Sequence, residues 1–139
     1  MLSVKIEKQL FDKNISVWIT PEERSVRFEY DVEHIAECYN GESFTKKLSH
    51  SEYKPLKEEI GNLNLQKVFD ENLGIAGCDG WTLVFALQDG AKITAELWNP
   101  EKDAEKPETG KLLSLCEKIF ALVGKDFWEG IEGCEEKKL

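Results

Sequence analysis

The sequence lacks the long apolar run that a membrane-spanning helix requires. Its longest uncharged apolar stretch, Trp81 to Leu87, is far shorter than the ~20 residues that cross a bilayer. A secretory leader is not expected either, because Lys5, Glu7 and Lys8 stand where a leader has an apolar stretch. We therefore expect a cytoplasmic protein that does not enter a membrane.

Residues that bind metals are few and widely spaced. The chain has four cysteines, at positions 38, 78, 116 and 134, and two histidines, at positions 34 and 50. No two cysteines have the C-x-x-C spacing of a zinc or redox site. We expect reduced, mostly structural thiols, and neither a metal nor another cofactor.

Sequence signatures of catalysis are also missing. The chain contains no G-x-S-x-G and no H-E-x-x-H motif. The run Asp70-x-Asn72-x-Gly74 begins like a calcium loop, but Ile75 stands where that loop needs glycine. His34 and Cys38 are four residues apart, but a Cys-His nucleophile also needs a third group to orient the base. We expect no catalytic activity, and an enzyme without a recognisable motif remains an alternative.

Acidic residues outnumber basic ones. The chain has 27 acids, 18 bases and a formal charge of −9, which argues against direct binding of nucleic acid and favours a basic protein partner. The segment from 70 to 105 is the most acidic part, since its only bases are Lys92 and Lys102. This segment is the most concentrated source of negative potential in the chain.

Alternating apolar residues predict several strands in the first half. The pattern occurs at Leu2, Val4 and Ile6, again from 15 to 19, and most clearly from 26 to 32. Residues 32–41 are ambiguous, because their spacing fits a helix ended by Asn40-Gly41 as well as a hairpin that turns there. We favour the hairpin, with Phe44 and Leu48 on the returning strand.

Two helices are predicted. Ser49 and Glu52 form a capping-box pattern before a helix from about 51 to 61. A second helix begins near Pro107 and ends near Gly124. Its apolar stripe consists of Leu112, Leu115, Cys116, Ile119, Leu122 and Val123. Residues 125–139 are expected to form a loosely packed tail, in which Trp128 and Ile131 could pack a short last turn against the body.

The order of these elements predicts an α+β fold. We expect one domain over residues 1–139, with an antiparallel sheet packed by helices on one face. The length is close to the commonest size of a single domain. A chain of this length buries enough surface to fold without a metal or a disulfide.

The Asp79-Gly80 and Asp89-Gly90 pairs are interpreted as turns. Asp89-Gly90 separates two strands, 81–87 and 93–98. A three-residue loop would pair Leu87 with Ile93, Phe85 with Ala95 and Leu83 with Leu97, which gives one wholly apolar face. Because a shift of one residue would mix the two faces, burial favours this register over a minimal turn.

The same register places Trp98 on the mixed face, opposite Thr82. There it would be either an interface anchor beside the acids that surround it or a core residue under a covering helix, and both alternatives stay open. As a partner-binding surface we predict Asp79, Glu96, Trp98, Glu101, Asp103 and Glu105.

The second half resembles small bacterial immunity proteins of polymorphic and contact-dependent toxin systems. The resemblance covers roughly residues 43–123 and rests on "CDGWTLVFALQDG…ITAELWNP", a polar loop with proline, and the amphipathic run "KLLSLCEKIFALV". It implies a small acidic protein without catalysis that blocks a toxin domain by binding it. An interaction module of another role is the alternative.

Overall fold

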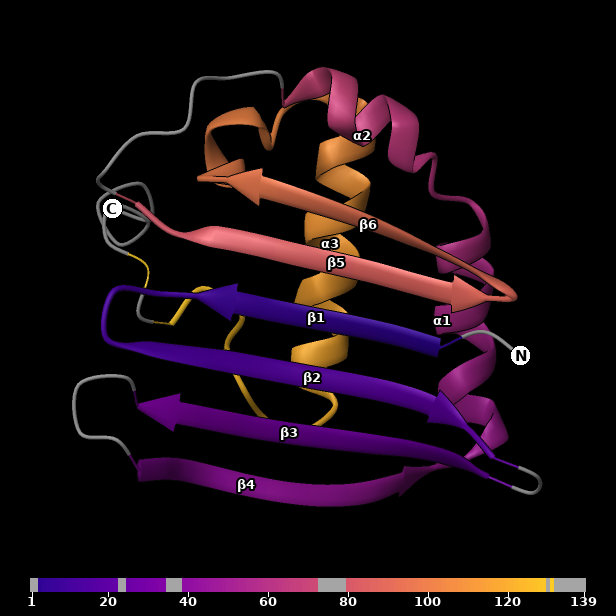
Figure 1. Ribbon diagram of the computed structural model, residues 1–139. Coiled ribbons are helices and arrows are strands. Elements are labelled where there is room, and N and C mark those ends of the chain that lie inside the picture. The colour runs from indigo at the N-terminus through magenta and orange to yellow at the C-terminus, as the bar shows by residue number, and fades with distance from the viewer. Residues whose placement is uncertain (1–2, 23–24, 35–38, 73–79, 130, 132–139) are drawn as a thin grey trace.

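The computed structural model describes residues 3–22, 25–34, 39–72, 80–129 and 131. They form one α+β domain whose six strands make a single antiparallel sheet in the order β4-β3-β2-β1-β5-β6 (Figure 1). The predicted fold class is therefore confirmed. The first four strands form a meander, and the β5–β6 hairpin joins it beside β1.

The meander follows the alternating pattern of the sequence. Its strands are β1 (Ser3–Gln9), β2 (Lys13–Pro21), β3 (Val26–His34) and β4 (Tyr39–Leu48). In β3 every second residue from Val26 to Val32 is buried, because successive side chains of a strand point to opposite faces. The same alternation orients β1, where Val4 and Ile6 are buried.

The ambiguous segment 32–41 belongs to an antiparallel strand pair, as favoured, but the turn is not at Asn40-Gly41. Both of these residues lie inside β4, and the residues between the two strands, 35–38, are outside the described part of the chain. The register between β3 and β4 shifts between Asp31 and Glu33. Glycine inside a strand commonly marks such a bulge, so the Asn-Gly pair resembled a turn signal without forming the turn.

Two short helices follow the meander. Helix α1 (His50–Gly61) begins with the predicted capping box, in which Ser49 accepts from the Glu52 N–H and Glu52 accepts from the Ser49 N–H. Helix α2 (Leu65–Glu71) is capped by Asn64, whose side chain accepts from Lys67 N. The sequence alone does not decide the state of 63–69, because an apolar run this short fits either a helix or a strand.

The β5–β6 hairpin has the predicted register. Strand β5 (Thr82–Asp89) pairs with β6 (Ala91–Trp98) so that Leu87, Phe85 and Leu83 lie opposite Ile93, Ala95 and Leu97. Gly90 sits at the tip with φ +80°, a conformation that glycine adopts without strain. The face is less buried near the turn: Leu87 is only partly buried, and 55% of the surface of Ile93 is exposed, because Ile93 lies next to the turn on an edge strand.

The chain then forms the short helix η1 (Pro100–Asp103) and the long helix α3 (Pro107–Ala121), with Pro107 in the first turn as expected. Gly124, with φ +71°, follows the end of α3. Among the described residues beyond it, Phe127 and Ile131 are almost fully buried. Of the predicted tail, 125–139, the structure describes residues 125–129 and 131; Trp128 and Ile131 pack against the body there, whereas Asp126 and Glu129 are exposed.

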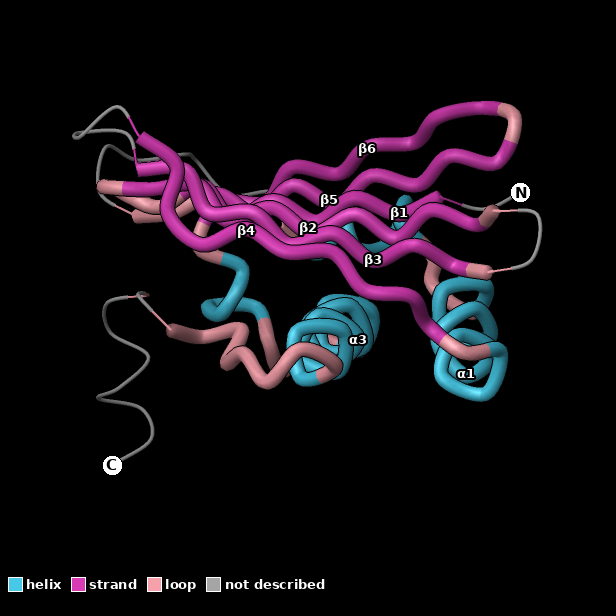
Figure 2. Tube along the Cα trace, turned by 90° about the horizontal axis from the view of Figure 1, so that it is seen from below, coloured by secondary structure: helices cyan, strands magenta, loops and turns pink. Residues whose placement is uncertain are grey.

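The helices pack against one face of the sheet (Figure 2). Between the sheet and α3 lies a core that includes Ile6, Phe28, Phe85, Leu112 and Phe120. No helix in the described part of the chain lies over the opposite face, which we call the uncovered face. Within the described residues, no helix is long and apolar enough to cross a membrane.

Candidate functional site

The uncovered face of the sheet carries a row of carboxylates. The register aligns one residue from each strand across it, and this row consists of Ser43, Asp31, Ser16, Glu7, Val84 and Glu96. The acids occupy alternate positions of the row, on β3, β1 and β6. With neighbouring strands about 4.8 Å apart, the backbone positions of successive acids are about 10 Å apart, within the range over which charges interact at moderate salt. Glu7 forms an ion pair with Lys5 at 3.4 Å, so Asp31 and Glu96 contribute most of the negative charge. We call Asp31, Glu7 and Glu96 the carboxylate row.

Bases gather toward the other end of the same face. Arg27 lies opposite Lys47, and Lys92 lies opposite Gln88 at the β5–β6 tip. Arg27 forms ion pairs with Glu29 at 2.8 Å and with Glu22 at 3.4 Å. The uncovered face is therefore acidic at one end and mixed at the other, which its total charge alone would not reveal.

Two tryptophans lie on this face, each beside a lysine. Trp18 is flanked in the register by Lys5 and Glu29, and the Lys5 ammonium lies 5.5 Å from its ring centre. Trp98 lies opposite Thr82 at the end of β6, and the Lys102 ammonium is 5.9 Å from its ring centre. Both indoles are half-buried. Within the described part of the chain, no helix covers Trp98.

The loop after Trp98 is fixed by Asn99. Asn99 has a left-handed backbone, with φ 46°, and exchanges two hydrogen bonds of 2.9 Å with Trp81: its N–H donates to Trp81 O, and its Oδ1 accepts from Trp81 N. A side chain at Gly80 would collide with the Asn99 amide, because an added Cβ would lie 2.4 Å from Oδ1. The Asp79-Gly80 pair thus supplies a glycine that makes room for Asn99.

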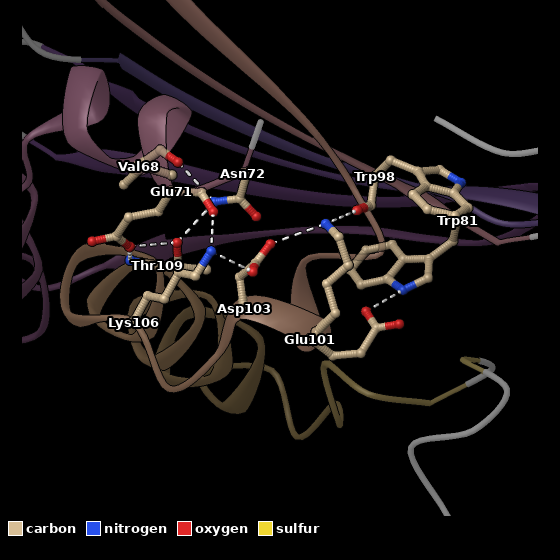
Figure 3. A network of polar contacts seen from close by, with 10 residues as sticks. Val68, Glu71, Asn72, Trp81, Trp98, Glu101, Asp103, Lys106 and Thr109 are labelled. Atoms are coloured by element: carbon tan, nitrogen blue, oxygen red, sulfur yellow. Dashed lines mark hydrogen bonds and ion pairs between the residues drawn. The ribbon is translucent and has the colours of Figure 1, made fainter. Parts of the chain in front are cut away.

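Glu101 and Asp103 take part in internal contacts of this loop (Figure 3). The Trp81 indole Nε1 donates to Glu101 Oε2 at 2.8 Å. Asp103 is largely buried and forms ion pairs with Lys102 at 3.0 Å and Lys106 at 2.9 Å. Burial by itself would raise the pKa of Asp103, but its bonds to these two lysines lower the pKa below its ordinary value.

A second set of hydrogen bonds joins α2 to the start of α3. Glu71 accepts from the backbone N–H of Thr109 at 2.8 Å and of Glu108 at 3.2 Å, and from the Thr109 hydroxyl at 2.7 Å. The Lys106 ammonium donates to the Glu71 carbonyl at 2.7 Å. Desolvation opposes the ionised carboxylate, yet these bonds lower the pKa of Glu71. The carboxylate thereby satisfies free N–H groups at the start of α3.

The predicted partner-binding residues thus fall into three groups. Glu96 and Glu105 are exposed, and Trp98 is half-buried on the uncovered face. Glu101 and Asp103 are engaged within the protein. Asp79 lies outside the described residues.

Sequence reasoning missed Glu7 and Asp31, which the sheet aligns with Glu96 although they are far away in the chain. Alternation along β1 and β3 places both acids on the polar side of their strands. The strand order β3-β2-β1-β5-β6, which no local pattern encodes, was needed to bring them to the same row.

Features suited to catalysis or metal binding are sparse in the described part of the chain. It contains no cluster of three or more His, Cys, Asp or Glu side chains with the geometry of a metal site. A shallow depression of about 650 Å³ between α1 and α3 is lined by Glu59, Asn62, Leu63, Gly110, Lys111, Ser114 and Lys118. Glu59 and Lys118 form an ion pair there. These lining residues include neither a histidine nor a cysteine.

Comparison with known proteins adds no identification. No protein-family model matches the chain, and no curated protein matches it.

Proposed function

We propose that this protein is a binding protein of the immunity type, which neutralises a basic toxin domain by covering it. Its docking surface is the carboxylate row together with Trp98, and Glu105 lies on the adjacent loop. The observation that carries the proposal is the uncovered sheet face, where Asp31, Glu7 and Glu96 align across the strands and Trp98 lies at the edge.

The carboxylate row supplies charge complementarity to such a partner. A toxin domain that handles nucleic acid must present lysines and arginines to phosphate, and an acidic surface attracts these same groups. Complementary potentials raise the rate of association by one to several orders of magnitude at low salt. Rapid binding suits a protein that must silence a toxin before it acts.

Trp98 supplies a large flat apolar group beside this charge. Tryptophan is enriched among the residues that dominate binding energies, especially where a partner excludes water from the indole. Strand β6 fixes the backbone of Trp98, to whose carbonyl Lys102 Nζ donates at 3.0 Å, and the same ammonium lies 5.9 Å from the centre of the indole ring. Little side-chain freedom is lost on binding when an anchor is already ordered.

Glu101 and Asp103 act differently in this proposal from the exposed acids. Their carboxylates hold the loop that follows Trp98, through Trp81 in one case and through Lys102 and Lys106 in the other. They therefore position the surface, whereas Glu96 and Glu105 face the partner. Neutralising Glu101 or Asp103 would disturb the loop and would not test charge alone.

The proposal is tested with the toxin domain encoded by the neighbouring gene, in a titration that follows loss of toxin activity. The wild type is expected to inhibit with one-to-one stoichiometry. Trp98→Ala is expected to weaken inhibition at least about tenfold, as for a central aromatic anchor. Phe69→Ala removes a half-exposed aromatic from α2 and serves as the control. A neighbouring gene without a toxin domain, or full inhibition by Trp98→Ala, would contradict the proposal.

A further inference from the structure

The sheet ends in two edge strands, β4 and β6. An edge strand has backbone N–H and C=O groups that no strand of its own sheet uses, and these groups can pair with a strand of another chain. Helix α2 runs alongside β6 (Figure 1). Beyond β4, by contrast, no element of the described part of the chain is present (Figure 1). Strand β4 is therefore the more accessible edge.

Most of β4 is regular enough to accept another strand. Its pairing with β3 runs without interruption from Leu48, opposite Val26, to Ser43, opposite Asp31. The shift in register comes only after this stretch, between Asp31 and Glu33. Alternate residues of an antiparallel strand turn both N–H and C=O away from the neighbouring strand, so roughly half of the residues in this stretch of β4 direct these groups outward.

The helix side of the β4 edge carries an acid, an aromatic ring and a base in alternate positions, at Glu42, Phe44 and Lys46. Glu42 forms an ion pair with Lys125 at 2.7 Å, and Lys46 Nζ donates to the carbonyl of Leu122 at 2.9 Å. Both contacts are with the segment that follows α3, which places the two charged side chains on the side of the sheet where the helices lie.

This order of residues is complementary to itself. If a second copy of β4 pairs antiparallel with the first and the register is centred on Phe44, Glu42 of each copy lies opposite Lys46 of the other. The two Phe44 rings then meet at the centre, and Ser43 lies opposite Thr45 on the uncovered face. Cross-strand pairs of opposite charge and of aromatic rings stabilise a sheet. A two-fold axis produces each charged pair twice.

Phe44 has an open side that a second copy would cover. Its ring stacks on Tyr30, with centres 5.1 Å apart, and Tyr30 meets Phe120 edge-on with centres 6.3 Å apart. Phe120 is fully buried, whereas Phe44 is only partly buried. The row of rings thus ends in Phe44 at the edge of the sheet. Another Phe44 beside it would continue the row and exclude water from the exposed side of the ring.

We propose that this protein forms a two-fold dimer in which β4 pairs antiparallel with β4 of a second copy, in the register centred on Phe44, so that the two six-stranded sheets become one. The dimer does not depend on the proposed function, because Glu96 and Trp98 lie on β6 at the opposite edge. A single pair of strands makes a small interface, and small interfaces are characteristic of weak complexes.

Sedimentation velocity tests the dimer and the two charged pairs. The wild type should be a monomer at about 1 µM and a dimer at about 500 µM, as for a small interface. Glu42→Lys and Lys46→Glu should each weaken dimerisation at least about tenfold, because each substitution places like charges opposite one another. Lys92→Glu is the matched control, since it reverses an exposed charge on the other edge strand, and it should dimerise as the wild type does. A wild type that stays monomeric, or equal effects of Lys46→Glu and Lys92→Glu, would overturn the proposal.

Mixing the two variants tests the register itself. A Glu42→Lys chain carries two bases on this edge and a Lys46→Glu chain carries two acids, so each repels its own kind but complements the other. An equimolar mixture should therefore form heterodimers at least about tenfold more tightly than either variant forms homodimers. Loss of the contacts with Lys125 or Leu122 cannot mimic this result, because mixing does not restore them. A mixture that associates no better than its components would overturn the register.

Hydrogen–deuterium exchange of the wild type tests the dimer without any variant. Exchange in residues 42–48 should slow several-fold between about 1 and 500 µM protein, because the outward N–H groups of β4 become hydrogen-bonded in the dimer. Exchange in β6, residues 91–98, should not change. Equal exchange in 42–48 at both concentrations would overturn the dimer. Neither experiment contains a toxin, so the dimer and the proposed function can fail separately.

Discussion

Trp81 and Glu101 are joined by a hydrogen bond of 2.8 Å from the indole Nε1 to the carboxylate Oε2. The bond ties the start of the β5–β6 hairpin to the loop that leaves it. It also explains why Glu101 is only partly exposed although it stands in the most acidic stretch of the chain. An acidic residue in that stretch can therefore stabilise the fold instead of contacting a binding partner.

Replacing Glu101 by alanine should destabilise the protein. The change removes a charged acceptor from a largely buried indole N–H, and such a loss costs about 1–3 kcal/mol. Equilibrium unfolding in urea would measure it. Glu105→Ala is the control, because Glu105 is exposed on the same loop and should change stability by less than about 0.5 kcal/mol. Equal effects of the two substitutions would show that the bond to Trp81 contributes nothing.

Gly80→Ala should be destabilising for two separate reasons. Gly80 has φ +142°, which alanine adopts only with strain, and the added Cβ would collide with the Asn99 amide. A loss of about 1–3 kcal/mol is expected, together with a change in the near-ultraviolet circular dichroism of Trp81. Gly61→Ala is the matched control, since nothing lies within 4 Å of a Cβ there. A variant at Gly80 as stable as the wild type would contradict the described packing.

Phe85→Ala should be the most damaging change in the hairpin. Phe85 is fully buried opposite Ala95, and removing a buried phenylalanine costs about 3–5 kcal/mol. Thermal unfolding would show a large fall in Tm. Gln88→Ala, at an exposed position of the same strand, should leave Tm within a few degrees. A small effect at Phe85 would mean that the hairpin does not bury this face.

Stability should fall on acidification, in part because of Glu71 and Asp103. The folded protein lowers the pKa of both carboxyls, so their stabilising contribution is present above their ordinary pKa. It is lost as the pH falls through the lowered folded-state values, since the unfolded chain then binds more protons. Urea unfolding from pH 7 to pH 3 should show a shallower decline for Glu71→Gln than for the wild type. Parallel declines would exclude a contribution from Glu71.

The parts of the fold that follow local rules were predictable from the sequence. The start of α1 follows from the capping box that Ser49 and Glu52 form. The register of the hairpin follows from placing Phe85 and Leu97 on the same apolar face of the strand pair. The position of the β3–β4 turn could not be predicted, because Asn40-Gly41 fits a bulge as well as it fits a turn. No neighbouring residue distinguishes the two.

The candidate site was predictable only in part, for a physical reason. Exposure of Glu96 and Glu105 follows from their polar surroundings, but the internal bonds of Glu101 and Asp103 depend on a tryptophan 20 residues away and on a loop geometry. Alignment of Glu7 with Glu96 depends on the order of strands in the sheet. The amino-acid composition gives the charge of these residues but not their positions in the folded protein.

The central claim is that the carboxylate row docks a basic toxin domain, and association kinetics at low salt test it most directly. Stopped-flow binding to the inactivated toxin domain would compare Asp31→Asn/Glu96→Gln with the control Asp70→Asn/Glu58→Gln. The control removes the same charge from exposed acids on α2 and α1. We predict that the row variant associates about tenfold more slowly than the control and depends less on salt. Equal association rates for the two variants would contradict the claim.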